Sequence, residues 1–208
     1  MIKVDKTNLK NVLLFQLEHH EDHRGSYTQL CHKADYQKII KEQTGQDVEF
    51  LEDDFACSSK YVLRGIHGDD RTWKLVTCLS GKFYIVIVNC DESSEDFGKW
   101  EKFILTKENG KQLLIPPKHG HAYQVLSDNA IFHYKQSCYY EGMVNQFTYK
   151  WDDPRFKIWW PIKNPITSQR DEMGREPEKK NEADYYLRSA RRWQAHRGAK
   201  TGGKDRAK

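Results

Sequence analysis

The chain carries at residues 74–90 the run KLVTCLSGKFYIVIVNC, in which Ser80-Gly81 separates two apolar stretches. Both stretches are rich in β-branched and aromatic residues and have the length of an ordinary strand. Short stretches of the same kind follow, with turn residues between them. The predicted strands are 75–79, 82–90, 102–106, 112–115, 122–126, 130–136 and 146–149.

The segments between these strands indicate how the chain turns. They include Ser80-Gly81, Glu108-Asn109-Gly110 and Ser127-Asp128-Asn129. Asn109-Gly110 is the clearest hairpin signal, because this dipeptide readily takes the positive φ angles of a tight turn. Residues 33–44 form the one helical candidate before the tail, with apolar residues on one side. Many short strands without intervening helices predict an all-β antiparallel sandwich or barrel with a short N-terminal helix.

The basic charge of the chain is concentrated after residue 171. Residues 172–208 hold 11 Lys and Arg against 6 Asp and Glu, a net charge of +5, while the whole chain carries +4. Residues 1–171 therefore carry −1, which disfavours a surface built for nucleic acid. We predict a folded domain over 1–171 and a charged C-terminal extension over 172–208, with a helix at 183–196 and a disordered end.

The cysteines bear on the compartment. The five cysteines, at positions 31, 57, 78, 90 and 138, are odd in number and lack close paired spacing. Cys78 and Cys90 fall within apolar strand-like runs, where a thiol behaves as a small hydrophobic side chain. The apolar run at 12–15 is too short for a signal peptide, and no stretch approaches a membrane span. These features predict a reduced, cytoplasmic protein without a membrane partner.

Residues 64–67, Arg-Gly-Ile-His, stand shortly before the 74–90 run, which begins with Lys74. A guanidinium, an imidazole and an ammonium are therefore placed near the ends of adjacent β-elements. Such a cluster can bind an anion and move a proton in one pocket, because histidine titrates near neutral pH. The alternative, which these residues alone leave open, is a surface turn that carries ordinary charges.

Further landmarks follow in a fixed order. They are Asp22-His23-Arg24-Gly25, Phe97-Gly98-Lys99-Trp100, Ile115-Pro116-Pro117-Lys118-His119-Gly120-His121, Tyr134-Lys135, Trp160-Pro161 and Ser168-Gln169-Arg170-Asp171. Together with the Arg-Gly-Ile-His segment, they resemble the dTDP-4-dehydrorhamnose 3,5-epimerase family over roughly residues 10–171. The resemblance implies the cupin double-stranded β-helix, or jelly roll. It also implies an isomerase that epimerises C3, C5 or both of a nucleotide-linked 4-keto-6-deoxy hexose or heptose, in surface-polysaccharide or deoxysugar biosynthesis.

The resemblance implies catalytic roles for four residues in proton exchange next to a ketone. His67 is the base, because the pKa of histidine lies near the working pH. Asp171 holds the tautomer of this base and stabilises the imidazolium. Lys74 lies beside the ketone oxygen and stabilises an enolate-like transition state. Tyr134 protonates the opposite face of the sugar as a neutral phenol.

Tyr134 has a plainer alternative role, as an aromatic side chain that packs across strands of the barrel. Strand alternation places Tyr134 on one face with Phe132 and Gln136. The same alternation places His133 and Lys135 on the other face.

The resemblance also implies eight substrate-binding residues. Arg24 and Arg64 match positions that hold the diphosphate, for which the planar guanidinium is suited. Gln29 stands where the dTDP-sugar enzymes carry an acid, and Glu52 and Asp54 stand where they carry amides. Since carboxylates only accept hydrogen bonds, these departures weaken the expectation of thymine and make guanine plausible. The set is completed by His121, Tyr140 and Arg170.

His119-Gly120-His121 raises the alternative of a metal site, because many cupins bind metal through His-x-His, a following Glu and a later His. This motif comes late in the chain, and position 69, two after His67, is Asp. We therefore predict no metal and no dissociable cofactor.

Two rival functions remain, a sugar-nucleotide 3,4-ketoisomerase and a catalytically lapsed sugar-nucleotide-binding module. Joint retention of the four predicted catalytic residues disfavours lapse. We expect a homodimer.

Overall fold

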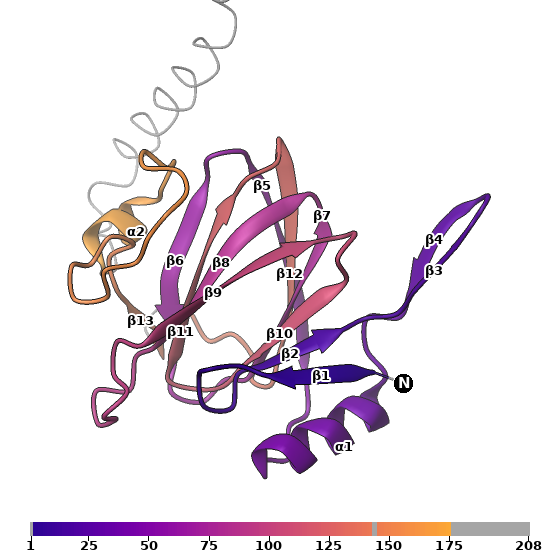
Figure 1. Ribbon diagram of the computed structural model, residues 1–208. Coiled ribbons are helices and arrows are strands. Elements are labelled where there is room, and N and C mark those ends of the chain that lie inside the picture. Colours follow the sequence, from indigo (N-terminus) through magenta and orange to yellow (C-terminus); the bar gives the residue numbers. More distant parts are fainter. Residues whose placement is uncertain (1, 143–144, 176–208) are drawn as a thin grey trace, which may run out of the picture.

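The computed structural model describes residues 2–142 and 145–175. Two antiparallel sheets face each other and form an open barrel (Figure 1). One sheet has the order β1-β2-β10-β7-β12-β5, and the other has the order β13-β6-β11-β8-β9. The strands of the first are β1 (Lys3–Lys6), β2 (Leu13–Gln16), β10 (Lys111–Ile115), β7 (Lys74–Ser80), β12 (Asn129–Gln136) and β5 (Glu52–Ser59). Those of the second are β13 (Phe147–Thr148), β6 (Leu63–Gly68), β11 (His119–Val125), β8 (Lys82–Asn89) and β9 (Trp100–Thr106).

The predicted strands are confirmed, but the turns at Ser80-Gly81, Glu108-Asn109-Gly110 and Ser127-Asp128-Asn129 do not close hairpins. The pairs β7–β8, β9–β10 and β11–β12 each consist of consecutive strands that lie in opposite sheets. The prediction of a hairpin at Asn109-Gly110 is therefore wrong. Gly110 has φ 55°, while the Asn109 side chain accepts from the backbone N–H of Thr106 and Lys111 at 3.1 and 3.2 Å. These bonds fix a corner between sheets, and such alternation is the jelly roll that the resemblance implied.

The main core fills the space between the two sheets. Alternate residues of facing strands meet there, among them Val76 of β7, Ile85 and Ile87 of β8, and Phe132 of β12. Because strand residues point alternately to the two faces, the same strands present a second apolar set outward. The sandwich therefore has apolar surface on its outer faces as well, and other segments cover it.

Helix α1 (Lys33–Thr44) covers the outer face of the six-stranded sheet, with the bounds that the sequence predicted. Its Tyr36 and Ile40 are buried against Phe15, Leu75 and other residues of β2, β7 and β10. The helix ends at Gly45, whose φ of 75° lies in the left-handed region that favours glycine. On the opposite side, Phe156 and Trp160 pack on the outer face of the five-stranded sheet.

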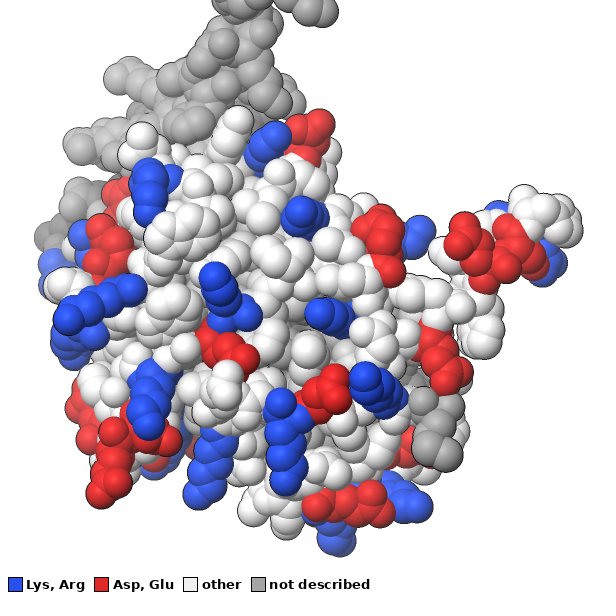
Figure 2. Space-filling view, viewed as in Figure 1, with Lys and Arg blue, Asp and Glu red and all other residues white. Residues whose placement is uncertain are grey.

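An arm formed by β3 (His19–Asp22) and β4 (Gly25–Thr28) was not predicted from the sequence. This two-stranded hairpin projects away from the barrel (Figure 1), and its residues are almost all exposed. Polar and charged side chains hid its strand character, because the usual alternation of buried and exposed residues is missing. On the face seen in Figure 2, basic and acidic side chains are interspersed over the body of the molecule.

The end of the described chain is helix α2 (Gln169–Met173), which lies beside β6 and β13 (Figure 1). This helix runs across the predicted boundary at 171/172, and the division of the chain there stays a prediction. The predicted helix at 183–196 and the predicted disordered end lie outside the described residues. In the part of the chain that the structure describes, neither helix is long and apolar enough to cross a membrane.

The cysteines agree with the sequence interpretation where it concerned packing. Cys78 and Cys90 are buried, and burial raises the pKa of each thiol to about 12. These two thiols are therefore protonated apolar core groups.

Candidate active site

One end of the space between the sheets gathers most of the predicted site residues. On the six-stranded sheet, Glu52 pairs with Gln136 and Gln136 pairs with Lys74 across β5, β12 and β7. In the adjacent row, Asp54 pairs with Tyr134. Directly paired residues of antiparallel strands share a face, so these side chains project into the same space between the two sheets, which we call the lumen of the barrel. The prediction for the face of Tyr134 is confirmed, since Phe132 and Gln136 are buried there.

The facing sheet contributes the histidines. His67, near the end of β6, pairs with His121 near the start of β11. The His121 ring stacks on Phe132 of the opposite sheet, with centroids 5.9 Å apart and planes at 5°. This contact spans the lumen and brings the β6–β11 residues close to those of β12. Burial, followed by the charges of Lys74 and His67, places the pKa of His121 well below its usual range.

The structure brings His67 and Asp171 together across 104 positions of sequence. Nε2 of His67 lies 2.7 Å from Oδ1 of Asp171, and the two side chains are 21% and 2% exposed. Because Nε2 is the ring nitrogen close to the carboxylate, Nδ1 is left to accept a proton. This pair is the His–Asp dyad that the resemblance implied, and the Asp171 carboxylate is held in place by further hydrogen bonds.

Helix α2 explains why Asp171 is fixed. Ser168 caps the helix, its hydroxyl accepting from the backbone N–H of Asp171 at 3.1 Å. In return, Oδ2 of Asp171 accepts from the backbone N–H and the hydroxyl of Ser168, at 3.1 and 2.7 Å. Oδ1 also accepts from the backbone N–H of Gly65 at 3.2 Å. A capping box, which normally only starts a helix, here orients the partner of a histidine.

The surroundings of the dyad shift the pKa values of both His67 and Asp171. Burial lowers the pKa of His67, although the contact with Asp171 opposes this shift, and the charges of Arg170 and Lys74 add to it. Burial by itself would raise the pKa of Asp171, but the contacts with His67 and Ser168 outweigh it and lower the pKa. Near neutral pH the pair therefore consists of a neutral imidazole and a carboxylate, which is the state that a general base requires.

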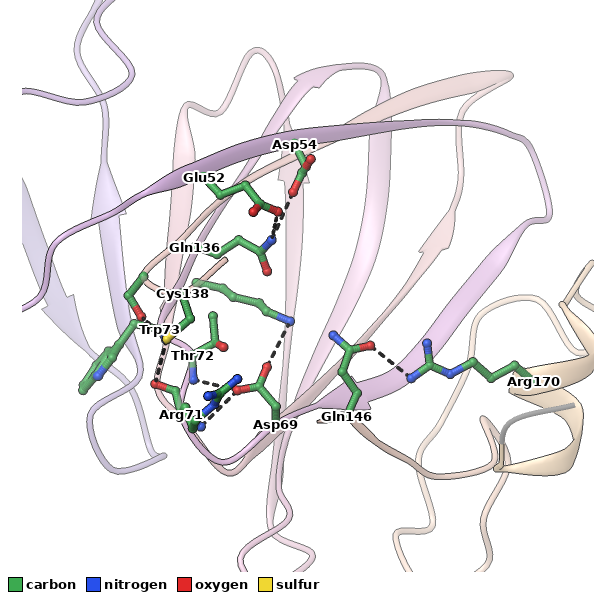
Figure 3. Close-up of polar contacts among 12 residues, drawn as sticks. Glu52, Asp54, Asp69, Arg71, Thr72, Trp73, Gln136, Cys138, Gln146 and Arg170 are labelled. Atoms are coloured by element: carbon green, nitrogen blue, oxygen red, sulfur yellow. Dashed lines mark hydrogen bonds and ion pairs between the residues drawn. The ribbon is translucent and has the colours of Figure 1, made fainter. Parts of the chain in front are cut away.

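Lys74 is 5% exposed, so its ammonium is withdrawn from solvent into the lumen. Its Nζ lies 3.9 Å from Oδ2 of Asp69. Asp69 is in turn held by the backbone N–H groups of Arg71 and Thr72, at 3.0 and 2.6 Å (Figure 3). Burial lowers the pKa of Lys74, the carboxylate of Asp69 raises it, and Arg170 lowers it further. A cation held in this way is ready to stabilise negative charge that develops on a bound molecule.

Tyr134 packs beside Phe132, with ring centroids 5.5 Å apart. Burial and the carboxylates of Asp54 and Glu52 raise the pKa of Tyr134 to about 12. The phenol is therefore protonated at neutral pH and can act only as a proton donor.

Two arginines lie at the edge of this lumen. Arg64 reaches from β6 to the other sheet, where its Nε donates to the hydroxyl of Ser58 on β5 at 3.1 Å. Arg170, on α2, donates to Thr148 at 2.8 Å and to the side-chain oxygen of Gln146 at 3.1 Å (Figure 3). The planar guanidinium of each residue is of the kind that binds carboxylate or phosphate oxygens.

Two predicted residues are not brought to the lumen of their own chain. Arg24 sits at the tip of the β3–β4 hairpin, 78% exposed in its side chain and paired with Asp22 at 2.6 Å. Gln29 follows the hairpin and is exposed. Tyr140, in contrast, lies near the site, because its backbone N–H donates to Glu52 at 3.0 Å.

Sequence reasoning gave no role to Ser168, Asp69 or Gln136, which hold the functional groups in place. The Ser-x-x-Asp spacing of residues 168–171 is a capping-box signal and could have revealed Ser168. Nothing local in the sequence marks Asp69 or Gln136, because their contacts come from other strands.

The histidines do not form a metal site within residues 2–142 and 145–175, where no group of three His, Cys, Asp or Glu residues is placed to hold an ion. His119 instead directs Nδ1 to the carbonyl of Pro117 at 3.1 Å. The absence of a metal from the reaction stays a prediction.

An imidazole backed by a buried carboxylate, with an ammonium and a phenol in the same lumen, defines an enzyme that transfers protons at a centre next to developing negative charge. A family model described as dTDP-4-dehydrorhamnose 3,5-epimerase matches residues 6–178. The chain belongs to this family, and both the resemblance and the assignment as an isomerase are confirmed.

Particular relatives agree with this assignment. The dTDP-4-dehydrorhamnose 3,5-epimerase of Shigella flexneri is 36% identical over 189 residues, which cover 89% of this chain and 100% of the relative. The crystal structure of the enzyme of that name from Elizabethkingia anophelis has a TM-score of 0.74 at 32% identity, covering 87% and 98% of the two chains. A Legionella pneumophila epimerase, solved with dTDP-4-keto-L-rhamnose, has a TM-score of 0.78 at 29% identity, covering 84% and 92%.

Proposed function

We propose that this protein epimerises C3, C5 or both of a nucleotide-diphospho-4-keto-6-deoxy sugar by removing a proton next to the C4 ketone. The observation that carries the proposal is the His67–Asp171 pair, 2.7 Å apart, in a barrel of this family. A fixed carboxylate behind a neutral imidazole supports general-base catalysis, whereas binding alone would not need it.

The geometry supports a role for each group. Nδ1 of His67 takes the proton from the carbon next to the ketone, and Asp171 stabilises the imidazolium that forms. The Lys74 ammonium stabilises the oxygen of the resulting enolate. The Tyr134 hydroxyl delivers a proton to the opposite face of the same carbon, which inverts it. Arg64 binds the diphosphate.

Exchange with solvent deuterium tests this function. The protein is incubated in D₂O with dTDP- and GDP-linked 4-keto-6-deoxy sugars, and NMR follows deuterium at C3 and C5. We expect deuterium to enter at one or both carbons while an epimer accumulates. Migration of the ketone from C4 to C3 would instead establish the rival 3,4-ketoisomerase. Binding of both sugar nucleotides without any exchange would establish a binding module.

We also propose that the enzyme is a homodimer in which the β3–β4 hairpin carries Arg24 to the site of the neighbouring subunit. The projection of the hairpin and the exposure of Arg24 support this arrangement, because the guanidinium does not reach its own lumen. Arg24→Ala and His67→Asn chains, each inactive alone, are co-expressed and purified as mixed dimers. One site of each mixed dimer then has both residues, so activity should return. A mixture as inactive as its components would contradict the arrangement.

A further inference from the structure

Two carboxylates, Glu52 and Asp54, lie at the rim of the lumen. Nε2 of Gln136 donates to Oε1 of Glu52 at 2.8 Å and to Oδ2 of Asp54 at 3.0 Å (Figure 3). Glu52 also accepts from the backbone N–H of Tyr140. Within the described ranges 2–142 and 145–175, no ion pair involves Glu52 or Asp54. The side-chain amide of Gln136 is therefore shared between the two carboxyl groups.

The neighbouring Asp53 shows what a compensated carboxylate on the same strand looks like. Asp53 points to the outer face, where it pairs with Lys135 and lies 2.6 Å from Nε2 of His133. Burial opposes ionisation there, but these two partners lower the pKa of Asp53. For Asp54, burial and the adjacent Glu52 carboxyl group both raise the pKa. Unlike Asp53, the lumen-facing pair has no compensating cation among residues 2–142 and 145–175, so further hydrogen-bond donors from a ligand would stabilise its negative charge.

The position of the pair indicates which part of a ligand lies against it. Glu52 is the first residue of β5, and Gln136, which binds both carboxyl groups, is the last residue of β12. The Glu52–Asp54 pair therefore stands where the lumen opens. Tyr140, 52% exposed, follows at the same rim. Lys74 and His67, two of the proton-transferring groups, are less exposed than Tyr140, with side chains 7% and 21% exposed. A sugar held at those groups leaves its nucleotide to extend toward the rim.

A carboxylate can only accept hydrogen bonds, and each of its oxygens can accept two. Diphosphate oxygens are acceptors and are repelled by such a pair. Thymine presents one N–H between two carbonyl oxygens, so it would set acceptors against acceptors. Guanine presents N1–H and N2–H₂ side by side, which matches a carboxylate with two donors.

We propose that Glu52 and Asp54 are specificity-determining residues that select a guanine-linked substrate by accepting hydrogen bonds from N1–H and N2–H₂ of the base. This inference rests on the proposed function, because it assigns the nucleotide of that substrate. The preference is a property of this chain's carboxylate pair, whereas the family is described by a dTDP sugar.

The test is the affinity for GDP and for dTDP, measured by calorimetry on the whole chain. We expect GDP to bind at least about tenfold more tightly than dTDP. The reason is that acceptor groups in a binding site discriminate against a base that offers fewer hydrogen-bond donors. In the Glu52→Gln/Asp54→Asn variant the preference should vanish, with dTDP affinity rising because amides also donate. Asp54→Asn alone should shift the ratio in the same direction if the double variant folds poorly. The control, Asp53→Asn on the outer face, should keep the ratio of the parent protein.

Other outcomes are separable from a failure of the proposed function. Equal or tighter binding of dTDP, or a ratio that the amide variants leave unchanged, would overturn the inference. If the protein then still exchanged deuterium into a dTDP-linked sugar, the proposed epimerase function would stand, and only the preference for guanine would be wrong. Failure to bind either nucleotide, together with no exchange in either sugar, would remove both.

Discussion

Replacing His67 with asparagine or alanine is expected to abolish deuterium exchange, with a loss of at least roughly 10²–10⁴-fold in rate. The reason is that Nε2 of His67 is engaged with Asp171, so the base is one nitrogen of one ring. Neither amide nor methyl can accept a proton near neutral pH. NMR in D₂O measures the rate, and circular dichroism shows that the fold is kept.

The chain offers a matched control for this substitution. His133 also lies against an aspartate, 2.6 Å from Asp53, but on the outer face of the same barrel. His133→Asn should therefore exchange at the rate of the parent enzyme. Exchange at near parental rate in His67→Asn would remove His67 from the role of base.

The pH profile of the parent enzyme should show the same group. Burial is the main cause that lowers the pKa of His67, so its folded-state pKa lies below the usual value of about 6.5. The neutral base is then present at pH 7 and is lost as pH falls through the lowered pKa. We expect kcat/KM to decline on the acidic side below pH of about 6.5, and this decline should be absent from the residual rate of His67→Asn.

Tyr134→Phe is expected to separate the two halves of the reaction, with epimer formation reduced by roughly 10²–10⁴-fold. His67 still removes the proton from its own face, so the enolate forms. The hydroxyl that would deliver a proton to the other face is gone, while the phenyl ring keeps its contact with Phe132. Solvent deuterium should then enter at the parent centre with retention, faster than epimer accumulates. NMR resolves both products in one sample.

Tyr84→Phe is the control for the loss of a phenol. The Tyr84 hydroxyl donates to the carbonyl of Trp159 at 2.9 Å, on the outer face of the five-stranded sheet. This variant should epimerise like the parent enzyme, since its hydroxyl does not face the lumen. If Tyr134→Phe also epimerised at the parental rate, Tyr134 would be only a packing aromatic, and water or another residue would supply the proton.

Much of the fold could be predicted because its signals are local. The strands from β7 to β12 are short β-branched and aromatic runs, and α1 has an apolar side made by Tyr36 and Ile40. The β3–β4 hairpin lacked such a signal, since it is solvated on both faces. The Asn109-Gly110 turn was found, but its role was misjudged. A turn looks the same in sequence whether the next strand returns to the same sheet or crosses to the other.

The amino-acid sequence predicted an all-β chain, the strand alternation that places Tyr134 on one face with Phe132 and Gln136, and a family resemblance that nominated His67, Lys74 and Asp171. The folded arrangement was needed to show that Asp171 meets His67, and that Ser168 and Gly65 hold it there. It was also needed to show that Glu52 and Asp54 share the side-chain amide of Gln136, while Arg24 stands apart from its own lumen. The difference arises from the distance along the chain over which each effect acts. Propensity and alternation act between near neighbours, whereas the charge and hydrogen bonding of a buried group depend on strands far away in the chain.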